Sequence, residues 1–414
     1  MMKAPAGVPA AGAIGRTVSA LRRRWALALA ALAAWPSPLL AGPGVLAPPS
    51  AAPVLVTPIA VFGTDDRVAP PARYGHVAEH IGLFFSNPAR TVCTAFCVAP
   101  NIVATAAHCL AQPGGKPARI ADFMFARGYD RVREFARVEG HAANAANQSV
   151  MSGDFQHRVK PPIDAANDWA LVRLSRNACP GNGLAILPMP ADQIMNAAKA
   201  GKVFQLSYHR DWTQWRLAYS TPCHVGRDFQ AAGWSSIAPD FLSADQMILH
   251  HCDTGGASSG SPMLVETKAG VAVVGINVGT YVQSKILSDR GQVTLRERAE
   301  TVANTAVNAA VFAEHVDRLR SATILGSSQQ IRSLQERLAA RSLYNHRIDG
   351  SYGPGLRAAI EGFERENRLP VTGLATADLL KRLDGQAPGG LGRVAPSSAP
   401  HSGTSPAAAP APRH

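Results

Sequence analysis

The region from 61 to 320 consists of many short apolar segments, each interrupted by glycine, asparagine, aspartate or proline. Examples are the segments 101–107 (NIVATAA), 169–174 (WALVRL) and 271–278 (VAVVGINV). Apolar segments of this length, separated by turn residues, are typical of strands. Many such strands in succession predict an all-β barrel or sandwich, closed by a helical stretch near 302–319.

The 414-residue chain is longer than one hydrophobic core usually organises, which predicts two domains with tails. From 326 to 384 apolar residues recur at helical spacing, as at Ile331, Leu334 and Leu338, so we expect a separate three-helix module. The composition of 385–414 is dominated by proline, alanine, serine and glycine, which predicts a disordered tail.

The N-terminal residues 1–41 indicate export. They combine a positively charged start with the apolar run 25–35 (WALALAALAAW), which Pro36 ends. A bilayer span needs about 20 apolar residues, so the run predicts a signal peptide, cleaved after Ala41, and an uncleaved anchoring helix is the alternative. Residues 42–60 are then a linker or pro-segment. We expect a secreted or periplasmic protein that contacts the membrane only through its signal peptide.

Six cysteines lie in the middle of the chain, and their even number predicts three disulfides in an oxidising compartment. The spacing of the cysteines does not decide their pairing. The sequence has no CxxC motif and no Cys/His spacing typical of zinc, so no metal or other cofactor is expected. The cysteines are Cys93, Cys97, Cys109, Cys179, Cys223 and Cys252.

The formal net charge of +12 favours anionic partners such as an acidic membrane or a cell-wall polymer. Basic residues interleaved with aromatic ones, the pattern typical of nucleic-acid binding, are not found. A nucleic-acid partner is therefore not expected.

Three motifs carry chemistry, in the order TAAHC with His108, NDWALVRL with Asp168, and GGASSGSP with Ser259. Hydrolysis of an amide needs an activated hydroxyl, a base, a group that orients the base, and donors for the oxyanion. Ser259, His108 and Asp168 can fill the first three roles. The small residues around Ser259 allow backbone N–H groups to converge, so this turn can fill the fourth.

These motifs together resemble the chymotrypsin/trypsin-like serine peptidases, and the G-S-P ending resembles their bacterial secreted branch. The segment 62–67 (FGTDDR) is also similar to that branch. The resemblance implies a mainly β double-barrel protease domain over 61–320. It also implies that His108 is the general base and acid, that Asp168 orients it, and that Ser259 is the nucleophile.

The resemblance places the oxyanion donors at the backbone N–H groups of Ala257 and Ser259. The family usually has glycine where Ala257 stands, and aspartate or asparagine where Ser258 stands. Alanine fits that position only if its φ is compatible. A motif shifted by one residue, with Ser258 as the important serine, is the alternative.

The same resemblance implies disulfides. Cys97 and Cys109 flank the strand that leads into His108 and are expected to pair. Cys223 and Cys252 are expected to join two strands beside the nucleophile loop, which leaves Cys93 with Cys179.

Substrate preference depends on Asp253, six residues before Ser259, where trypsin-like enzymes place the floor of the pocket for the P1 side chain. An anionic floor would favour Arg or Lys at P1. The alternative is a turn or N-cap aspartate. Glutamate-specific relatives typically have histidine in the strand after the nucleophile, where this chain has Asn277, so glutamate preference is disfavoured.

The segment 328–383 resembles a three-helix peptidoglycan-binding domain through IRSLQERL, IDGSYGP, AAIEGF and LPVTG. The resemblance implies a groove for the stem peptide or glycan that includes Asp349, Tyr352 and Gly353. Leu356 and Arg368 depart from the family, which usually has threonine and glycine there.

The sequence therefore predicts an exported serine endopeptidase that acts on peptides or proteins through an acyl-enzyme and is held near peptidoglycan. A catalytically impaired, protease-like scaffold that binds cell wall or partner proteins is the alternative. A hydrolase of peptidoglycan itself generally uses zinc or paired carboxylates, and neither constellation is visible.

Overall fold

The computed structural model describes residues 60–112, 118–139, 148–155, 161–220, 223, 225, 238–289 and 292–385, with only the backbone at 214, 282–289 and 292–302. The predicted signal peptide (1–41), nearly all of the predicted linker (42–60) and the tail from 386 lie outside the described residues. Among the described helices, none combines the length and apolar character that a bilayer span requires.

The first sheet is antiparallel and comes from the N-terminal half of the region 61–320. Neighbouring strands pair in the order β5 (Glu134–Arg137), β4 (Met124–Arg127), β1 (Ile81–Ser86), β2 (Thr91–Ala99), β3 (Ile102–Thr105), β7 (Ala170–Arg173) and β6 (Val150–Ser152).

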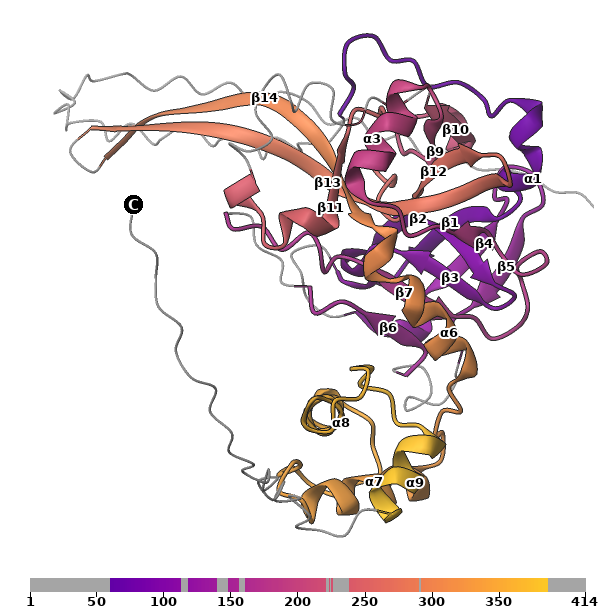
Figure 1. Ribbon diagram of the computed structural model, residues 1–414, viewed down its shortest axis with the longest axis vertical. Coiled ribbons are helices and arrows are strands. Elements are labelled where there is room, and N and C mark those ends of the chain that lie inside the picture. The colour runs from indigo at the N-terminus through magenta and orange to yellow at the C-terminus, as the bar shows by residue number, and fades with distance from the viewer. Residues whose placement is uncertain are drawn as a thin grey trace, which may run out of the picture. The chain divides into compact units, whose positions relative to one another are not determined.

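The second sheet follows in the chain, with antiparallel pairing along its main path. Figure 1 shows its strands β13 and β14 as a long hairpin. The order is β10 (Leu217–Ser220), β9 (Val203–Tyr208), β12 (Pro262–Thr267), β13 (Gly270–Asp289), β14 (Gln292–Asn308) and β11 (Met247–His250), and β8 (Ala185–Ile186) pairs with β13 in parallel.

One apolar core contains side chains from both curled sheets, including Phe84 and Phe96 from the first and Phe204 and Leu264 from the second. The six residues of β9, VFQLSY, are all buried, and the alternating Phe204, Leu206 and Tyr208 pack in this core. The predicted mainly β, chymotrypsin-like architecture is confirmed.

Short helical turns connect the strands. The predicted helix near 302–319 is only partly correct, because residues up to Asn308 belong to β14, where they pair with β11 and β13. The helices before the C-terminal module are η1 (Ala72–Tyr74), α1 (Gly75–Ala78), η2 (Ala107–Leu110), η3 (Ile120–Asp122), α3 (Ala191–Lys199), η4 (Thr213–Trp215), η5 (Ala238–Asp240), η6 (Ala244–Gln246), η7 (Ala309–Val311) and α6 (Ala313–Ser321).

The C-terminal region is helical, with α7 (Ser328–Ala339), α8 (Pro354–Glu366) and α9 (Ala377–Gly385). Ser327 begins α7 as a capping box with Gln330, which satisfies backbone donors at the helix start. The predicted apolar positions Ile331, Leu334 and Leu338 are fully buried in a core of their own.

Three disulfides are present, and two of the expected pairings are wrong. Cys223 pairs with Cys252 as expected, but Cys93 pairs with Cys109, and Cys97 with Cys179. The register explains the exchange: Phe96 lies opposite Ala104, so the chain that continues past β3 runs back beside the start of β2. Cys109 therefore reaches Cys93, with a Cα–Cα distance of 6.1 Å.

Candidate active site

His108 and Asp168 meet at one edge of the first sheet. His108 lies in η2, which follows β3, and Asp168 lies just before β7. Because β3 and β7 are antiparallel neighbours, with Thr105 opposite Ala170, the end of one strand lies beside the start of the other. His108 donates its backbone N–H to Asp168 Oδ1 at 2.8 Å, and its ring Nδ1 lies 2.7 Å from Oδ2.

This contact fixes how His108 can act as a base. A neutral imidazole that donates from Nδ1 to the Asp168 carboxylate presents Nε2 as its basic atom. Burial lowers the pKa of His108, but the charge and hydrogen bond of Asp168 outweigh burial, so the pKa lies above its ordinary value of 6.5. The Asp168 side chain is only 5% exposed, whereas the His108 side chain is 30% exposed, so the carboxylate is buried behind a ring that solvent can reach.

The serine motif forms a tight turn before β12. Ser258 N–H donates to Gly255 O at 3.1 Å, and Ser261 N–H donates to Ser258 O at 3.0 Å. Gly260 has φ +83°, and a Cβ there would lie 2.1 Å from Thr105 Oγ1 and 2.2 Å from the Thr94 carbonyl oxygen. Only glycine fits this position, which explains the glycine that follows the predicted nucleophile.

Ser259, His108 and Asp168 line one cavity of about 300 Å³, together with Gly255 and Ala257. Among the described residues, no hydrogen bond joins Ser259 Oγ to His108. Hydrogen bonds of this type are often long in an enzyme without substrate and tighten on binding. The structure therefore brings the three predicted residues to one cavity, with the His108–Asp168 half of the arrangement already bonded.

Ser258, the alternative serine, is buried and does not line this cavity. The side-chain nitrogen Nδ2 of Asn277 lies 3.2 Å from the Ser258 carbonyl oxygen and 3.3 Å from its Oγ. His250 Nε2 lies 3.0 Å from Asn277 Oδ1 and completes this buried network of hydrogen bonds. Ser258 thus has a structural position, while Ser259 faces the cavity.

Ala257 has φ +81°, in the left-handed region that alanine disfavours. This is the conformation that glycine adopts readily, which accounts for the family's usual glycine here. The alanine is compatible with the fold, but only with strained backbone.

Asp253 does not form the floor of the cavity, so this expectation is corrected. Its carboxylate accepts hydrogen bonds from the backbone N–H groups of Phe62 (2.8 Å) and Asp66 (3.0 Å). It is 2% exposed and is not among the residues that line the cavity. The FGTDDR segment occupies both carboxylate oxygens, so Asp253 gives no support for Arg or Lys at P1.

His209 lies behind the serine turn and was missed by sequence analysis. Its Nδ1 accepts from Gly255 N–H at 2.9 Å, and its Nε2 lies 2.7 Å from Ser207 Oγ. Burial lowers the pKa of His209 to about 3, so the ring is neutral near pH 7. No local motif marks this histidine, because its partner is 46 residues away in the chain.

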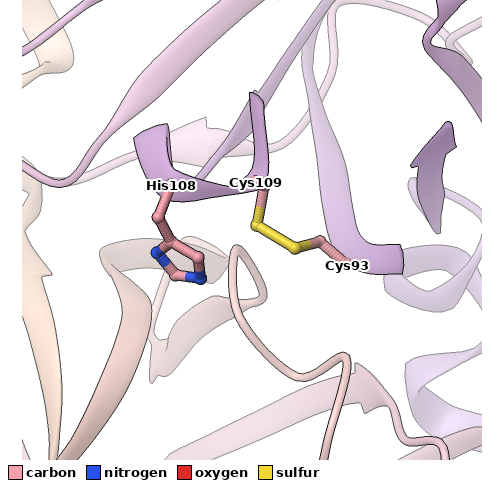
Figure 2. A group of neighbouring side chains, drawn as sticks. All are labelled: Cys93, His108 and Cys109. Atoms are coloured by element: carbon pink, nitrogen blue, oxygen red, sulfur yellow. A yellow bond between two sulfur atoms is a disulfide. The ribbon is translucent and has the colours of Figure 1, made fainter. Parts of the chain in front are cut away.

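The possible ligand atoms of Cys93, His108 and Cys109 lie within 4.8 Å of one another, close enough to be considered as a metal site (Figure 2). A thiolate is the form of cysteine that binds metal, and both sulfurs are joined in a disulfide. The His108 ring is engaged with Asp168. These residues do not suit a metal ion while the disulfide is intact.

In the C-terminal module, the predicted wall-binding residues mainly build structure. Tyr352 is 5% exposed and donates its hydroxyl to the Gly373 carbonyl oxygen, and its expected part in a ligand groove stays a prediction. Asp349 Oδ1 accepts from Gln335 Nε2 at 3.0 Å and from Ser351 N–H at 2.8 Å. Gly353 is the N-cap of α8. Of these three, Asp349 alone is exposed.

The two departures from the module's family pattern also have structural explanations. Leu356 is 1% exposed and packs in the module's core. Arg368 has φ +54°, the left-handed conformation in which glycine is usual.

These features define the class of chymotrypsin-fold serine peptidases: two antiparallel sheets, a His–Asp pair at a sheet edge, and a serine turn at the same cavity. A family model described as Trypsin matches residues 71–288, which is more than half of the chain. The chain therefore belongs to the trypsin family, as predicted.

A second family model, described as a putative peptidoglycan binding domain, matches residues 327–383. Among solved structures, one titled as a Glu endopeptidase in complex with MPD is similar, with 15% identity and a TM-score of 0.41. The match covers 62% of this chain and 98% of that chain. No curated protein matches this sequence.

Proposed function

We propose that the protein is an exported serine endopeptidase with His108, Asp168 and Ser259 as its triad. The observation that carries the proposal is the bonded His108–Asp168 pair, which shares a cavity with Ser259 in a trypsin-family chain. Ser259 Oγ attacks the substrate carbonyl carbon and transfers its proton to His108 Nε2. His108 then protonates the departing amine as the C–N bond breaks. Water, activated by His108, hydrolyses the acyl ester and restores Ser259.

The cavity suggests a preference for uncharged P1 side chains. Of the described residues that line it, only His108 and Asp168 are a histidine or a carboxylate, and their side chains are engaged with each other. Its other polar walls include Thr254, Asn277 and Thr280, which are neutral. A charged P1 side chain would find no opposite charge on these walls to offset its desolvation.

The match to a peptidoglycan-binding family supports placement of the enzyme at the cell wall. The three disulfides support an oxidising compartment outside the cytoplasm. Export itself rests on the sequence of residues 1–41. Together these observations favour a peptidase that is held near its substrates by the C-terminal module.

A catalytically impaired scaffold is the second candidate. It is favoured by the strained backbone of Ala257 and by the lack of a hydrogen bond between Ser259 and His108 among the described residues. In that case wall or partner binding would be the function, and the cavity would not turn over peptides.

The test is hydrolysis of a mixed peptide library by the purified chain that begins at Gly42, beside Ser259→Ala and Ser258→Ala. Cleavage abolished by S259A and retained by S258A would support the proposed triad. Cleavage after neutral residues would support the proposed preference. No cleavage by any of the three, with retained binding to isolated cell wall, would favour the scaffold.

A further inference from the structure

We propose that Thr94, on β2, is a positioning residue that holds Ala257 in its left-handed conformation and so keeps the oxyanion donors in place. The inference rests on the proposed peptidase function. It assigns a catalytic consequence to a buried hydroxyl that lies outside the three chemical motifs.

Thr94 contacts the nucleophile loop through two different groups. Its backbone N–H donates to the Ser259 carbonyl oxygen at 2.9 Å. Its side-chain Oγ1 donates to the Ala257 carbonyl oxygen, also at 2.9 Å. The two bonds hold the loop at Ser259 and Ala257, whose backbone N–H groups are the expected oxyanion donors.

The side-chain bond is specific because a hydroxyl has only one proton to donate. The other carbonyl near Oγ1, that of Tyr208, lies 3.5 Å away, so Ala257 is the better acceptor. Thr94 Oγ1 in turn accepts the Tyr208 N–H at 3.0 Å, which orients the hydroxyl. Thr94 and Tyr208 are both fully buried, so water is not at hand to replace the hydroxyl.

Ala257 needs such a restraint because its φ is +81°. In the left-handed region the alanine Cβ crowds the backbone, so an unrestrained alanine favours a negative φ. Relaxation to negative φ rotates the adjoining peptide groups and turns the Ala257 N–H relative to the Ser259 N–H. The Thr94 bond to the Ala257 carbonyl opposes that rotation.

The importance of the Thr94 hydroxyl for catalysis should therefore depend on the residue at 257. With alanine, Thr94→Val is expected to lower kcat about tenfold, the effect of losing one buried hydrogen bond that is needed in the transition state. KM is expected to change less than twofold, because the oxyanion forms only during reaction. Thr94→Ser keeps the hydroxyl and is expected to keep most of kcat.

With glycine at 257, the left-handed conformation carries no Cβ penalty. In the A257G background, T94V is therefore expected to lower kcat less than twofold. The matched control is Thr105→Val, which removes another buried hydroxyl bond on the neighbouring strand, from Thr105 Oγ1 to the Thr94 carbonyl oxygen at 2.8 Å. Its effect is expected to be equal with alanine or glycine at 257.

The experiment measures kcat, KM and the affinity for a peptide aldehyde, whose hemiacetal uses the oxyanion donors, for these variants. Weaker aldehyde binding by T94V that A257G restores supports the inference. An equal loss from T94V in both backgrounds would overturn it and leave Thr94 as a support for the Tyr208 amide alone.

Urea unfolding of the same variants separates this inference from the proposed function. If the chain that begins at Gly42 shows no cleavage that depends on Ser259, the peptidase proposal fails. The inference still predicts that T94V and A257G are coupled in the free energy of unfolding. Additive effects would refute the restraint on Ala257, whatever the activity.

Discussion

The nucleophile loop at 255–261 and the turn at 367–373 of the C-terminal module each hold a non-glycine residue at positive φ. In the nucleophile loop that residue is Ala257, buried and bonded from β2 by Thr94. In the module turn it is Arg368, which is exposed. The module turn is tied instead by the buried Glu364. The difference is that the Thr94 hydroxyl on β2 donates directly to the left-handed residue Ala257, whereas Glu364 binds Thr372 and Gly373 and leaves Arg368 itself exposed.

The largest expected effect is that of Gly260→Ala in the nucleophile loop. Its Cβ would lie 2.1 Å from Thr105 Oγ1 and 2.2 Å from a backbone oxygen of Thr94, at φ +83°. We expect a loss of stability of about 3 kcal/mol or more, and loss of cleavage, because the loop must move away from β2. Urea unfolding and peptide hydrolysis measure the two effects.

Gly63→Ala is the matched control. Gly63 has a similar φ of +86°, but nothing lies within 4 Å of a Cβ built there. Only the conformational penalty should remain, about 1 kcal/mol, with cleavage retained. Equal effects at the two glycines would show that close packing does not distinguish the catalytic loop.

The second prediction concerns acid. Cleavage needs neutral His108, whose pKa is raised by the Asp168 carboxylate beyond the lowering caused by burial. Activity should therefore fall, as pH decreases, with a midpoint above 6.5 in the pH profile of kcat/KM. Asp168→Asn removes the carboxylate charge and should lower kcat by about 10⁴-fold while shifting any remaining midpoint downward. An unshifted midpoint would argue against His108 as the titrating base.

Acid should also weaken the support of the nucleophile loop. Burial lowers the folded pKa of His209 to about 3, from an ordinary value of 6.5. The unfolded chain then binds the proton more readily, so this contribution to stability is lost as pH falls below about 6.5 toward 3. His108 contributes with the opposite sign, because its folded pKa is raised. His209→Asn can still accept a hydrogen bond from Gly255 N–H but does not titrate. The free energy of unfolding, measured with urea at several pH values, should therefore decrease less with falling pH in this variant.

The chemical groups could be predicted from sequence because each lies in a short motif. His108 and Asp168 follow from TAAHC and NDWALVRL, and the antiparallel pairing of β3 with β7 joins them at one edge. The mainly β fold follows from strand-length apolar segments. These features depend on local pattern and on one simple rule of sheet pairing.

The incorrect predictions concern residues whose partners are determined by tertiary packing. Asp253 was expected to face substrate, yet it binds backbone N–H groups of residues 187 and 191 positions away. Cys93 and Cys97 lie four residues apart on one strand, so their partners depend on strand register. Thr94 has no signal at all beyond its place in β2.

The fourth prediction tests the module turn. Glu364 accepts from Thr372 N–H (2.6 Å), Gly373 N–H (2.9 Å) and the Thr372 hydroxyl (2.6 Å). Glu364→Ala leaves these donors without their acceptor and should destabilise the module by about 2 kcal/mol, with faster hydrogen exchange at Thr372 and Gly373. Glu364→Gln can replace most of the bonds and should lie near wild type.

Glu361→Ala is the control on the same helix, because it removes ion pairs that are partly exposed, with Arg357 and Arg365. We expect it to cost less than about 1 kcal/mol. Peptide cleavage should be unchanged in all three variants. If E364A lowered kcat while leaving the module folded, the two loops would not be independent.

The smallest expected effect is that of Arg368→Gly, which removes the left-handed penalty from the exposed module turn. Because Arg368 has φ +54° and is exposed, glycine should stabilise the module by up to about 1 kcal/mol, measured by urea unfolding. Ala257→Gly removes the same kind of penalty from the nucleophile loop, but there the Thr94 bond already opposes relaxation.

The decisive comparison is therefore the response of each left-handed residue to glycine when the Thr94 hydroxyl is absent. Arg368→Gly should act alike with and without Thr94→Val, whereas the stability gain from Ala257→Gly should shrink once the Thr94 hydroxyl is removed, because an unrestrained alanine can relax to negative φ and lose its penalty. Equal gains from A257G in both backgrounds would show that the buried and exposed left-handed residues are held in the same way.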